Sequence, residues 1–183
     1  IELLSSQVER CNEILKRLTL NPVEEDEFID KDLTMREYLS EIISSFKDIS
    51  KKNFIFNFDQ FSNVKKITKS IEIVYGLRNF IGNANKFSKE TIYINLKSDS
   101  EMTEITIEDD GNGYPRDVLS KIGEPYLRSK DPIEKEKSGL GLGLFIGKTL
   151  LEKNFASINC KNSKTRSGAE VIIKWNNRDL FNI

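Results

Sequence analysis

Two short segments of alternating apolar and polar residues constrain the fold of this chain more than any other feature. They are residues 91–97 (TIYINLK) and 104–109 (EITIED), and a polar turn at 98–101 joins them. Because successive side chains of a strand point to opposite faces, each segment predicts a strand with one apolar face. The short connection predicts that the two strands form an antiparallel hairpin. Similar segments predict further strands at 53–58, 156–161 and 169–175.

Helical periodicity predicts the elements that cover this sheet. Thr34 and Glu37 have the spacing of a capping box, which begins a helix over 34–49. Other helices are expected at 69–87, 116–122 and 141–154. We therefore expect an α+β fold, an α/β sandwich with a mixed, mostly antiparallel sheet and helices on one face.

The first 32 residues are expected to lie outside this sandwich. Residues 1 to about 19 predict an amphipathic helix ended by Asn21 and Pro22, because apolar residues recur in steps of three and four. They are Leu4, Val8, Cys11, Leu15 and Leu18. A lone helix of this length is marginal in water, so it needs a partner. The acidic segment 23–32 predicts a linker, which gives the boundaries 1–22, 23–32 and 33–183. Since the chain starts at Ile1 inside a predicted helix, we expect it to be a piece of a longer protein.

The composition excludes several kinds of site and partner. The net charge of −1 shows no basic excess, which argues against a nucleic-acid partner. The sequence has no histidine, which excludes a Ser-His-Asp triad, a zinc site with histidine ligands and a phosphohistidine within this chain. The two cysteines, Cys11 and Cys160, are too far apart for a disulfide framework or a metal motif. The sequence contains no run of about 18 apolar residues, so it predicts no membrane span.

The first of three candidate motifs lies on the helix expected at 69–87. Asn79, Asn83 and Lys86 are spaced by four and three residues, so they share one helix face. An amide oxygen suits Mg²⁺, and a lysine one turn further along can bind phosphate. An accidental spacing in a sequence rich in asparagine is the alternative.

The second motif follows the strand at 104–109. The carboxylate of Asp109 can accept a hydrogen bond from an exocyclic amine such as that of adenine, and Gly111 and Gly113 let backbone approach a flat base. A simple turn at the end of a strand is the alternative.

The third motif opens the helix expected at 141–154. Alternating glycines before a helix N-terminus predict a cradle of backbone N–H groups for phosphate. The motif is neither the dinucleotide fingerprint nor a P-loop, and a flexible loop is the alternative. Its residues are Gly139, Leu140, Gly141, Leu142, Gly143 and Leu144.

The three motifs follow one another on a helix, at the end of a strand and at the start of a helix. In this order they resemble the Bergerat-type ATP-binding domain, over about residues 33–176. Histidine kinases, type II topoisomerases, Hsp90-like chaperones and MutL-like repair proteins share this domain. The resemblance implies ATP and Mg²⁺ as cofactors. The branches that hydrolyse ATP carry a glutamate where this sequence has Asn79, and such a residue activates water.

Three features resemble the histidine kinase branch. They are residues 77–88 (LRNFIGNANKFS), residues 122–130 (IGEPYLRSK) and the leading helix, which fits the second helix of a dimerisation hairpin. Three segments are also similar to RegB/PrrB-type redox-responsive sensor kinases, namely residues 123–130, 139–152 (GLGLGLFIGKTLLE) and 168–175 (GAEVIIKW). The resemblance implies transfer of the γ-phosphoryl of MgATP to a histidine outside this chain, and then to an aspartate of a response regulator. It also implies a homodimer in the full-length protein, and a cytoplasmic domain whose parent is anchored in the bacterial inner membrane.

The resemblance also implies a role for each motif residue. Asn83 ligates Mg²⁺, and Asn79 supports it or contacts phosphate. Lys86 and Arg128 reach phosphate, and Asp109 binds the adenine amine. Residues 112–138 form a lid over the nucleotide. The remaining contacts with the nucleotide are implied for Phe87, Gly111, Gly113, Tyr126, the six residues 139–144 and Gly168.

Two other classes of function remain open from the sequence. One is a nucleotide-gated dimer or clamp of the ATPase branch, which steady-state hydrolysis would favour. The other is a scaffold that no longer binds nucleotide. Cys11 is either a small buried apolar residue, the interpretation we favour, or a redox sensor at a dimer interface.

Overall fold

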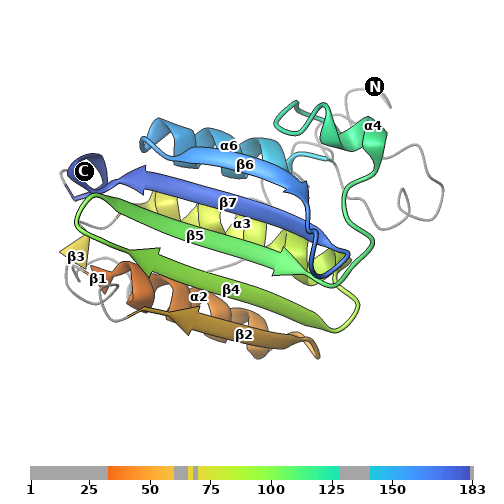
Figure 1. Cartoon of the computed structure of the whole chain (residues 1–183), viewed down its shortest axis with the longest axis horizontal. Helices are drawn as coiled ribbons and strands as arrows, with labels where there is room; N and C mark the ends of the chain where they lie inside the picture. Colours follow the sequence, from red (N-terminus) through yellow and green to blue (C-terminus); the bar gives the residue numbers. More distant parts are fainter. Residues whose placement is uncertain (1–32, 60–65, 68–69, 128–140, 182–183) are drawn as a thin grey trace, which may run out of the picture. The chain divides into compact units, whose positions relative to one another are not determined.

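The computed structural model describes residues 33–59, 66–67, 70–127 and 141–181 (Figure 1). They belong to one compact unit, Asp32–Ile183. The helix and linker expected before residue 33 lie outside the described residues, as does most of the second half of the expected lid. Four candidate residues also lie outside: Cys11, Arg128, Gly139 and Leu140.

In the part of the chain that the structure describes, five strands form one sheet. The order is β2-β4-β5-β7-β6, in which β2 runs parallel to β4 and all other neighbours are antiparallel. This confirms the expected mixed, mostly antiparallel sheet and the central hairpin. The strands are β2 (Asn53–Phe58), β4 (Thr91–Ser98), β5 (Met102–Asp109), β6 (Ser157–Asn162) and β7 (Ala169–Asn176). A separate pair, β1 (Leu33–Thr34) with β3 (Lys66–Ile67), was not expected.

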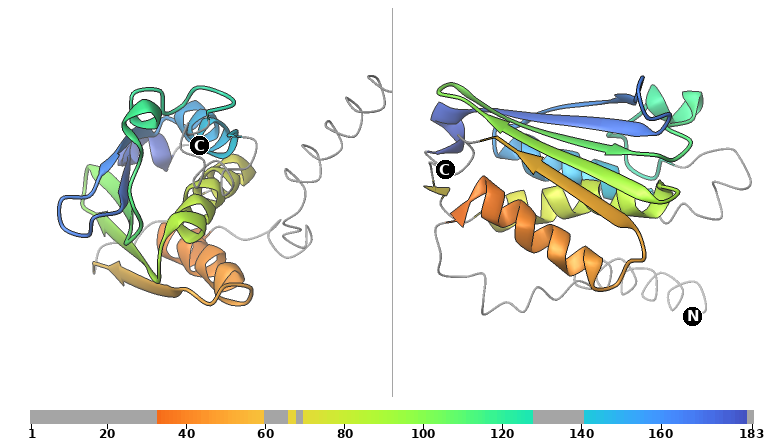
Figure 2. Two further views of the ribbon diagram at one scale, coloured as in Figure 1. Left: turned by 90° about the vertical axis from the view of Figure 1, so that its right-hand side faces the viewer. Right: turned by 60° about the horizontal axis from the view of Figure 1, so that its bottom comes forward.

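Three long helices cover one face of the sheet, as Figure 2 shows. They are α2 (Met35–Lys47), α3 (Ile71–Phe87) and α6 (Gly143–Lys153). Two short helices complete the described structure, α4 (Arg116–Leu119) and α7 (Asn177–Leu180). This arrangement confirms the α/β sandwich, and no helix in the described ranges is long and apolar enough to cross a membrane.

The helix starts show why the elements begin where they do. The capping box of α2 is present, since the Thr34 side chain accepts from Glu37 N while the Glu37 carboxylate accepts from Thr34 N. Helix α3 begins two residues later than expected because Ser70 caps it, accepting from Ile73 N at 3.3 Å. Helix α6 also begins two residues late, because Gly141 has a φ of +70°, which does not fit a helix.

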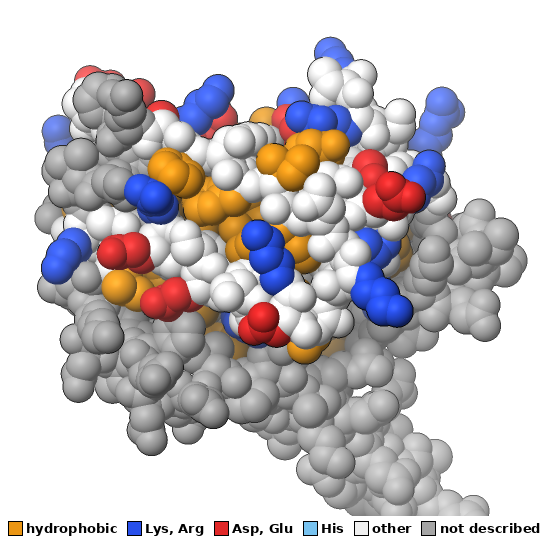
Figure 3. Space-filling view, turned by 90° about the horizontal axis from the view of Figure 1, so that it is seen from below, with side chains coloured by type: hydrophobic (Ala, Val, Ile, Leu, Met, Phe, Trp, Pro, Cys, Tyr) orange, Lys and Arg blue, Asp and Glu red, His pale blue; other side chains and the backbone are white. Residues whose placement is uncertain are grey.

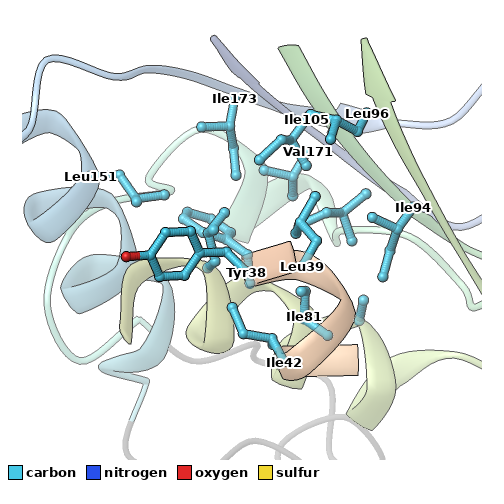
Figure 4. Close-up of a cluster of buried hydrophobic side chains, with 14 of the residues drawn as sticks. Tyr38, Leu39, Ile42, Ile81, Ile94, Leu96, Ile105, Leu151, Val171 and Ile173 are labelled. Carbon is cyan, nitrogen blue, oxygen red and sulfur yellow. The ribbon is translucent and has the colours of Figure 1, made fainter. Parts of the chain in front are cut away.

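Strand alternation sets the core between the sheet and these helices. Ile94 lies opposite Ile107, and Ile105 lies opposite Ile173, so their side chains share the inner face. Figure 4 shows apolar side chains of the helices, such as Leu39, pointing toward those of the strands. All five strands therefore depend on one core, in which truncation of a buried leucine typically costs about 2–5 kcal/mol.

The edge strand β2 leaves part of its apolar side exposed. Its three phenylalanines were expected on one face, and Phe54 is buried there, but Phe58 is 43% exposed. The Arg36 guanidinium lies 3.8 Å from the centroid of the Phe58 ring and covers part of it. Seen from the side on which β2 and α2 lie, apolar and basic side chains are intermixed on the surface (Figure 3).

Candidate functional site

The first and third motifs meet where helices α3 and α6 cross. A Cβ on Gly147 would lie 3.2 Å from the carbonyl oxygen of Gly76, and one on Gly76 would lie 2.5 Å from Leu151 Cγ. The two backbones therefore approach more closely than larger residues allow. This crossing places Asn79 beside the start of α6, where a Cβ on Gly143 would lie 3.6 Å from Asn79 Oδ1.

The two asparagines of α3 differ in their bonding. The Asn79 amide donates from Nδ2 to the carbonyl oxygen of Tyr75 at 2.8 Å, which fixes the orientation of the amide and leaves Oδ1 toward Gly143. Asn83 lies one turn further along the same face and is half-buried. No described residue forms a hydrogen bond with the Asn83 amide. Among the described residues, therefore, nothing prevents its oxygen from binding a ligand.

Asp109 stands at the end of β5 and is only 3% exposed. Its Oδ1 accepts two backbone hydrogen bonds, from Gly111 N at 2.8 Å and from Ala169 N at 3.2 Å. Burial raises the pKa of this carboxyl above its ordinary value, although the two hydrogen bonds oppose that shift. Within the described ranges no group donates to Oδ2, so this oxygen is the one that can accept from a ligand.

The glycines around Asp109 are required by contacts within the fold itself. A Cβ on Gly111 would collide with the carbonyl oxygen of Phe87 and lie 2.8 Å from Asp109 Oδ1. A Cβ on Gly168 would collide with the backbone and carboxylate oxygens of Asp109. The structure therefore shows that these glycines let three backbone segments converge on one carboxylate.

The loop between α3 and β4 links the first motif to the second. Asp110 accepts backbone hydrogen bonds from Lys89 N at 2.7 Å, Glu90 N at 3.1 Å and Thr91 N at 3.0 Å. Burial raises the pKa of Asp110, but these hydrogen bonds lower it further, so it lies below the ordinary value. On the other side, Lys52 Nζ donates to the carbonyl oxygen of Ser88 at 2.6 Å. The end of α3 is thus held by two charged side chains that sequence reasoning did not select.

The remaining candidate residues lie around this centre with different exposures. Phe87 is half-buried, and the exposed Lys86 has its Nζ 5.8 Å from the centroid of the Phe87 ring. Tyr126 is 60% exposed and has a φ of +60°, so the structure does not pack it in the core. Leu127 N donates to the carbonyl oxygen of Gly141 at 3.1 Å, which joins the two described ends that flank residues 128–140. Leu142 and Leu144, at the start of α6, are half-buried.

A further polar group was missed because no local signal reveals it. Asn162, at the end of β6, binds the backbone of Tyr114, which lies 48 residues away in sequence. The Tyr114 ring is buried beside Cys160, and burial raises the pKa of the Cys160 thiol to about 11. That thiol is therefore protonated at neutral pH and is a poor nucleophile.

Comparisons with known proteins identify the family of this chain. The family described as histidine kinase-, DNA gyrase B- and HSP90-like ATPase matches residues 68–179. The chain is 31% identical to the sensor histidine kinase RegB of Cereibacter sphaeroides over 95% of its own length and 41% of that protein. It is 29% identical to the sensor histidine kinase CpxA of Escherichia coli K12 over 48% of its length and 19% of that protein. The chain thus spans less than half the length of these relatives.

Solved structures show the same fold. A mycobacterial sensor histidine kinase, MprB, superposes with a TM-score of 0.62 at 20% identity, covering 79% of this chain and 95% of that one. The nucleotide-free catalytic domain of the histidine kinase ThkA superposes with a TM-score of 0.64 over 79% of this chain and 95% of that one, also at 20% identity. Together with the match over residues 68–179, these findings show that the chain belongs to the histidine kinase-, DNA gyrase B- and HSP90-like ATPase family of ATP-binding domains.

Proposed function

We propose that this chain is the ATP-binding catalytic part of a sensor histidine kinase. It transfers the γ-phosphoryl group of MgATP to a histidine that lies outside the chain, and an aspartate of a response regulator receives the group next. One observation carries the proposal: the second and third motifs both lie against helix α3. Gly111, whose N–H binds the Asp109 carboxylate, abuts the Phe87 carbonyl at the end of α3, and Gly143 lies beside Asn79.

The proposed adenine contact follows from the bonding of Asp109. Two backbone N–H groups already occupy Oδ1, so the carboxylate is held in one orientation with Oδ2 directed to the ligand. A carboxylate oxygen accepts a hydrogen bond from the amine of adenine. Gly111 and Gly168 let three backbone segments lie close to the Asp109 carboxylate. Beside these segments, Phe87 supplies a half-buried aromatic surface.

The proposed phosphate and metal contacts lie on α3 and at the start of α6. Mg²⁺ prefers oxygen ligands and takes few of them from protein, which fits the amide oxygen of Asn83, to which no described residue donates a hydrogen bond. When bound, Mg²⁺ neutralises phosphate charge during the transfer. In this proposal Asn79 orients the site, and Lys86 and Arg128 bind phosphate. Gly113 belongs with Gly111 to the wall of the adenine site, and Tyr126 lies near the nucleotide. The backbone that flanks the triphosphate comes from Gly139, Leu140, Gly141, Leu142, Gly143 and Leu144.

The side chain at position 79 favours phosphoryl transfer over hydrolysis. An amide cannot remove a proton from water, and the Asn79 Nδ2 is already committed to the Tyr75 carbonyl. Water in the site would therefore lack the general base that a glutamate supplies at this position in the hydrolysing branches. The γ-phosphoryl then passes to a docked nucleophile, whose placement is the main contribution to the rate.

The proposal includes the partners of the longer protein. They are its histidine-bearing helix, a response regulator and a second copy in a homodimer, with no nucleic acid. We propose that residues 1–22 belong to the dimerisation hairpin and that residues 33–183 form the catalytic domain on the cytoplasmic side of an inner membrane.

A phosphotransfer assay tests the proposal. The chain is mixed with radiolabelled MgATP and a separate histidine-bearing hairpin of the same protein, and phosphate on the hairpin is tested for loss in acid. At a MgATP concentration well below the wild-type dissociation constant, we expect acid-labile label with the wild-type chain and at most about a tenth of it with Asp109→Asn. Asp179→Asn, the same change at an exposed position of α7, is the control and should leave labelling intact. Steady-state release of phosphate with no labelled hairpin would instead support the ATPase branch, and failure to bind MgATP would support a scaffold.

A further inference from the structure

The side chain of Asn162 binds both backbone polar groups of Tyr114. Its Oδ1 accepts from Tyr114 N at 2.6 Å, and its Nδ2 donates to the Tyr114 carbonyl oxygen at 3.0 Å. This is the pairing that a neighbouring strand would offer to one residue. Since Asn162 is the last residue of β6, it extends the edge of the sheet by one side chain.

The residue before Tyr114 is shaped to admit this amide. Gly113 has a φ of +76°, and a Cβ there would lie 2.7 Å from Asn162 Oδ1. Any side chain at this position would displace the amide of Asn162, besides adopting an unfavourable backbone conformation. The last glycine of the second motif therefore serves the contact with Asn162.

Asn162 is joined to the Asp109 carboxylate through its own strand neighbour. It pairs with Ala169 in the sheet, and Ala169 N donates to Asp109 Oδ1. The next residue, Ser163, donates from Oγ to Glu108 Oε1 at 2.8 Å. The β6–β7 hairpin thus holds the end of β5 and, through Asn162, the segment that follows it.

We propose that Asn162 is a positioning residue for nucleotide binding. By fixing Tyr114, it holds the turn from Asp109 to Gly113 in its binding conformation before the nucleotide arrives. The turn then loses its conformational freedom when the chain folds and not when the nucleotide binds. The free-energy cost of ordering it therefore does not reduce the affinity for nucleotide. This inference rests on the nucleotide site proposed above.

Asn162→Asp separates this role from mere support of the strand. The variant keeps the shape and the acceptor, but at neutral pH it replaces the donor with a charged oxygen that faces the Tyr114 carbonyl. Protonation restores an O–H donor beside a C=O acceptor, which is the pattern of the amide. We therefore expect a dissociation constant for MgADP about tenfold higher than in the wild type at pH 8. As the pH falls toward 4, where an aspartate of ordinary pKa is about half protonated, this difference should shrink.

Other ionisable groups near this end also titrate or carry charge. They are Asp109, Glu108, the Tyr114 phenol, the Cys160 thiol and Lys148 of α6. Asn159→Asp retains all of them and introduces the same charge on the exposed side of the same strand, so it is the matched control. Affinities are therefore compared with this control at each pH, by calorimetry on the full 183-residue chain.

Asn162→Ser is the second variant, which removes the amide without adding charge. We expect it to bind MgADP about threefold to tenfold more weakly at every pH, without recovery in acid. If Asn162→Asp is unfolded at pH 8 by circular dichroism, the serine variant decides alone. The inference is overturned if both variants bind as tightly as the control, or if the loss in Asn162→Asp is the same at about pH 4 and at about pH 8. A wild-type chain that does not bind MgADP would overturn the proposed nucleotide site itself.

Discussion

Replacing Asp109 with asparagine should separate nucleotide affinity from folding stability. Asparagine has the same shape and keeps an oxygen that can accept from Gly111 N and Ala169 N, so the two backbone hydrogen bonds survive. At the other position an NH₂ group replaces the free carboxylate oxygen. A donor then faces the amine of adenine, which is also a donor.

The magnitude follows from the loss of one hydrogen bond to a charged acceptor. Such bonds contribute about 1.5–3 kcal/mol, which corresponds to about a 10-fold to 150-fold loss in affinity at 1.4 kcal/mol per factor of ten. The dissociation constant of MgADP, measured by isothermal calorimetry at pH 7.5, should rise by that factor.

Stability without nucleotide should move in the opposite direction. Because burial raises the folded-state pKa of Asp109 above its ordinary value of 3.8, ionisation of this carboxyl costs stability. That cost is absent below the unfolded pKa, develops as the pH rises toward the folded pKa, and is complete above the folded pKa. Asp109→Asn removes it, so the variant should unfold at the same or a higher temperature than the wild type at pH 7.5. The two melting temperatures should converge near pH 3.5.

Two results would refute this reasoning. If Asp109→Asn binds MgADP within about threefold of the wild type, the carboxylate does not contact the base. If the variant melts far below the wild type at pH 7.5, the carboxylate supports the fold, and the loss of affinity is only a consequence of unfolding.

Three further predictions test the backbone around the site. Gly168→Ala should destabilise the chain by about 1–3 kcal/mol and weaken MgADP binding, because its Cβ collides with Asp109; urea unfolding and calorimetry measure the two effects. Gly147→Ala should cost about 1 kcal/mol or more in urea unfolding, because it separates α3 from α6, whereas Gly143→Ala, with 3.6 Å to Asn79 Oδ1, should have the smaller effect on stability. Asp110→Asn should lower stability by about 1–3 kcal/mol at pH 7, because Asp110 accepts three backbone hydrogen bonds. Since its folded-state pKa is lowered, this contribution is present above the unfolded pKa and is lost as the pH falls through the folded pKa, so melting temperatures of variant and wild type should converge in acid.

Much of the fold could be predicted because its signals are local. Alternation gave the hairpin of β4 and β5 with its inner face, and the capping box marked the start of α2. The two-residue errors at the starts of α3 and α6 arose from a serine cap and from one glycine with positive φ, which periodicity does not report. The pair β1–β3 is too short to leave an alternating pattern.

The candidate site was predicted as three separate motifs, and part of it escaped prediction. The positions of Asn79, Asp109 and Gly143 followed from residue type and context. The charged residues that hold the end of α3, Asp110 and Lys52, were missed because their partners lie 19 to 37 residues away. A side chain that binds a backbone group at such a separation has no fixed spacing to detect.

The sequence by itself determined which segments become strands and helices and which residue types could bind a nucleotide, because alternation, helical period and capping act over a few neighbouring residues. Only the tertiary structure decided that β2 runs parallel to β4, that β7 lies between β5 and β6, and that α3 meets α6 at a pair of glycines. It also decided that Gly113 faces Asn162 and that Gly168 faces Asp109. These contacts depend on packing between segments distant along the chain, where steric fit and burial, rather than local propensity, set the geometry.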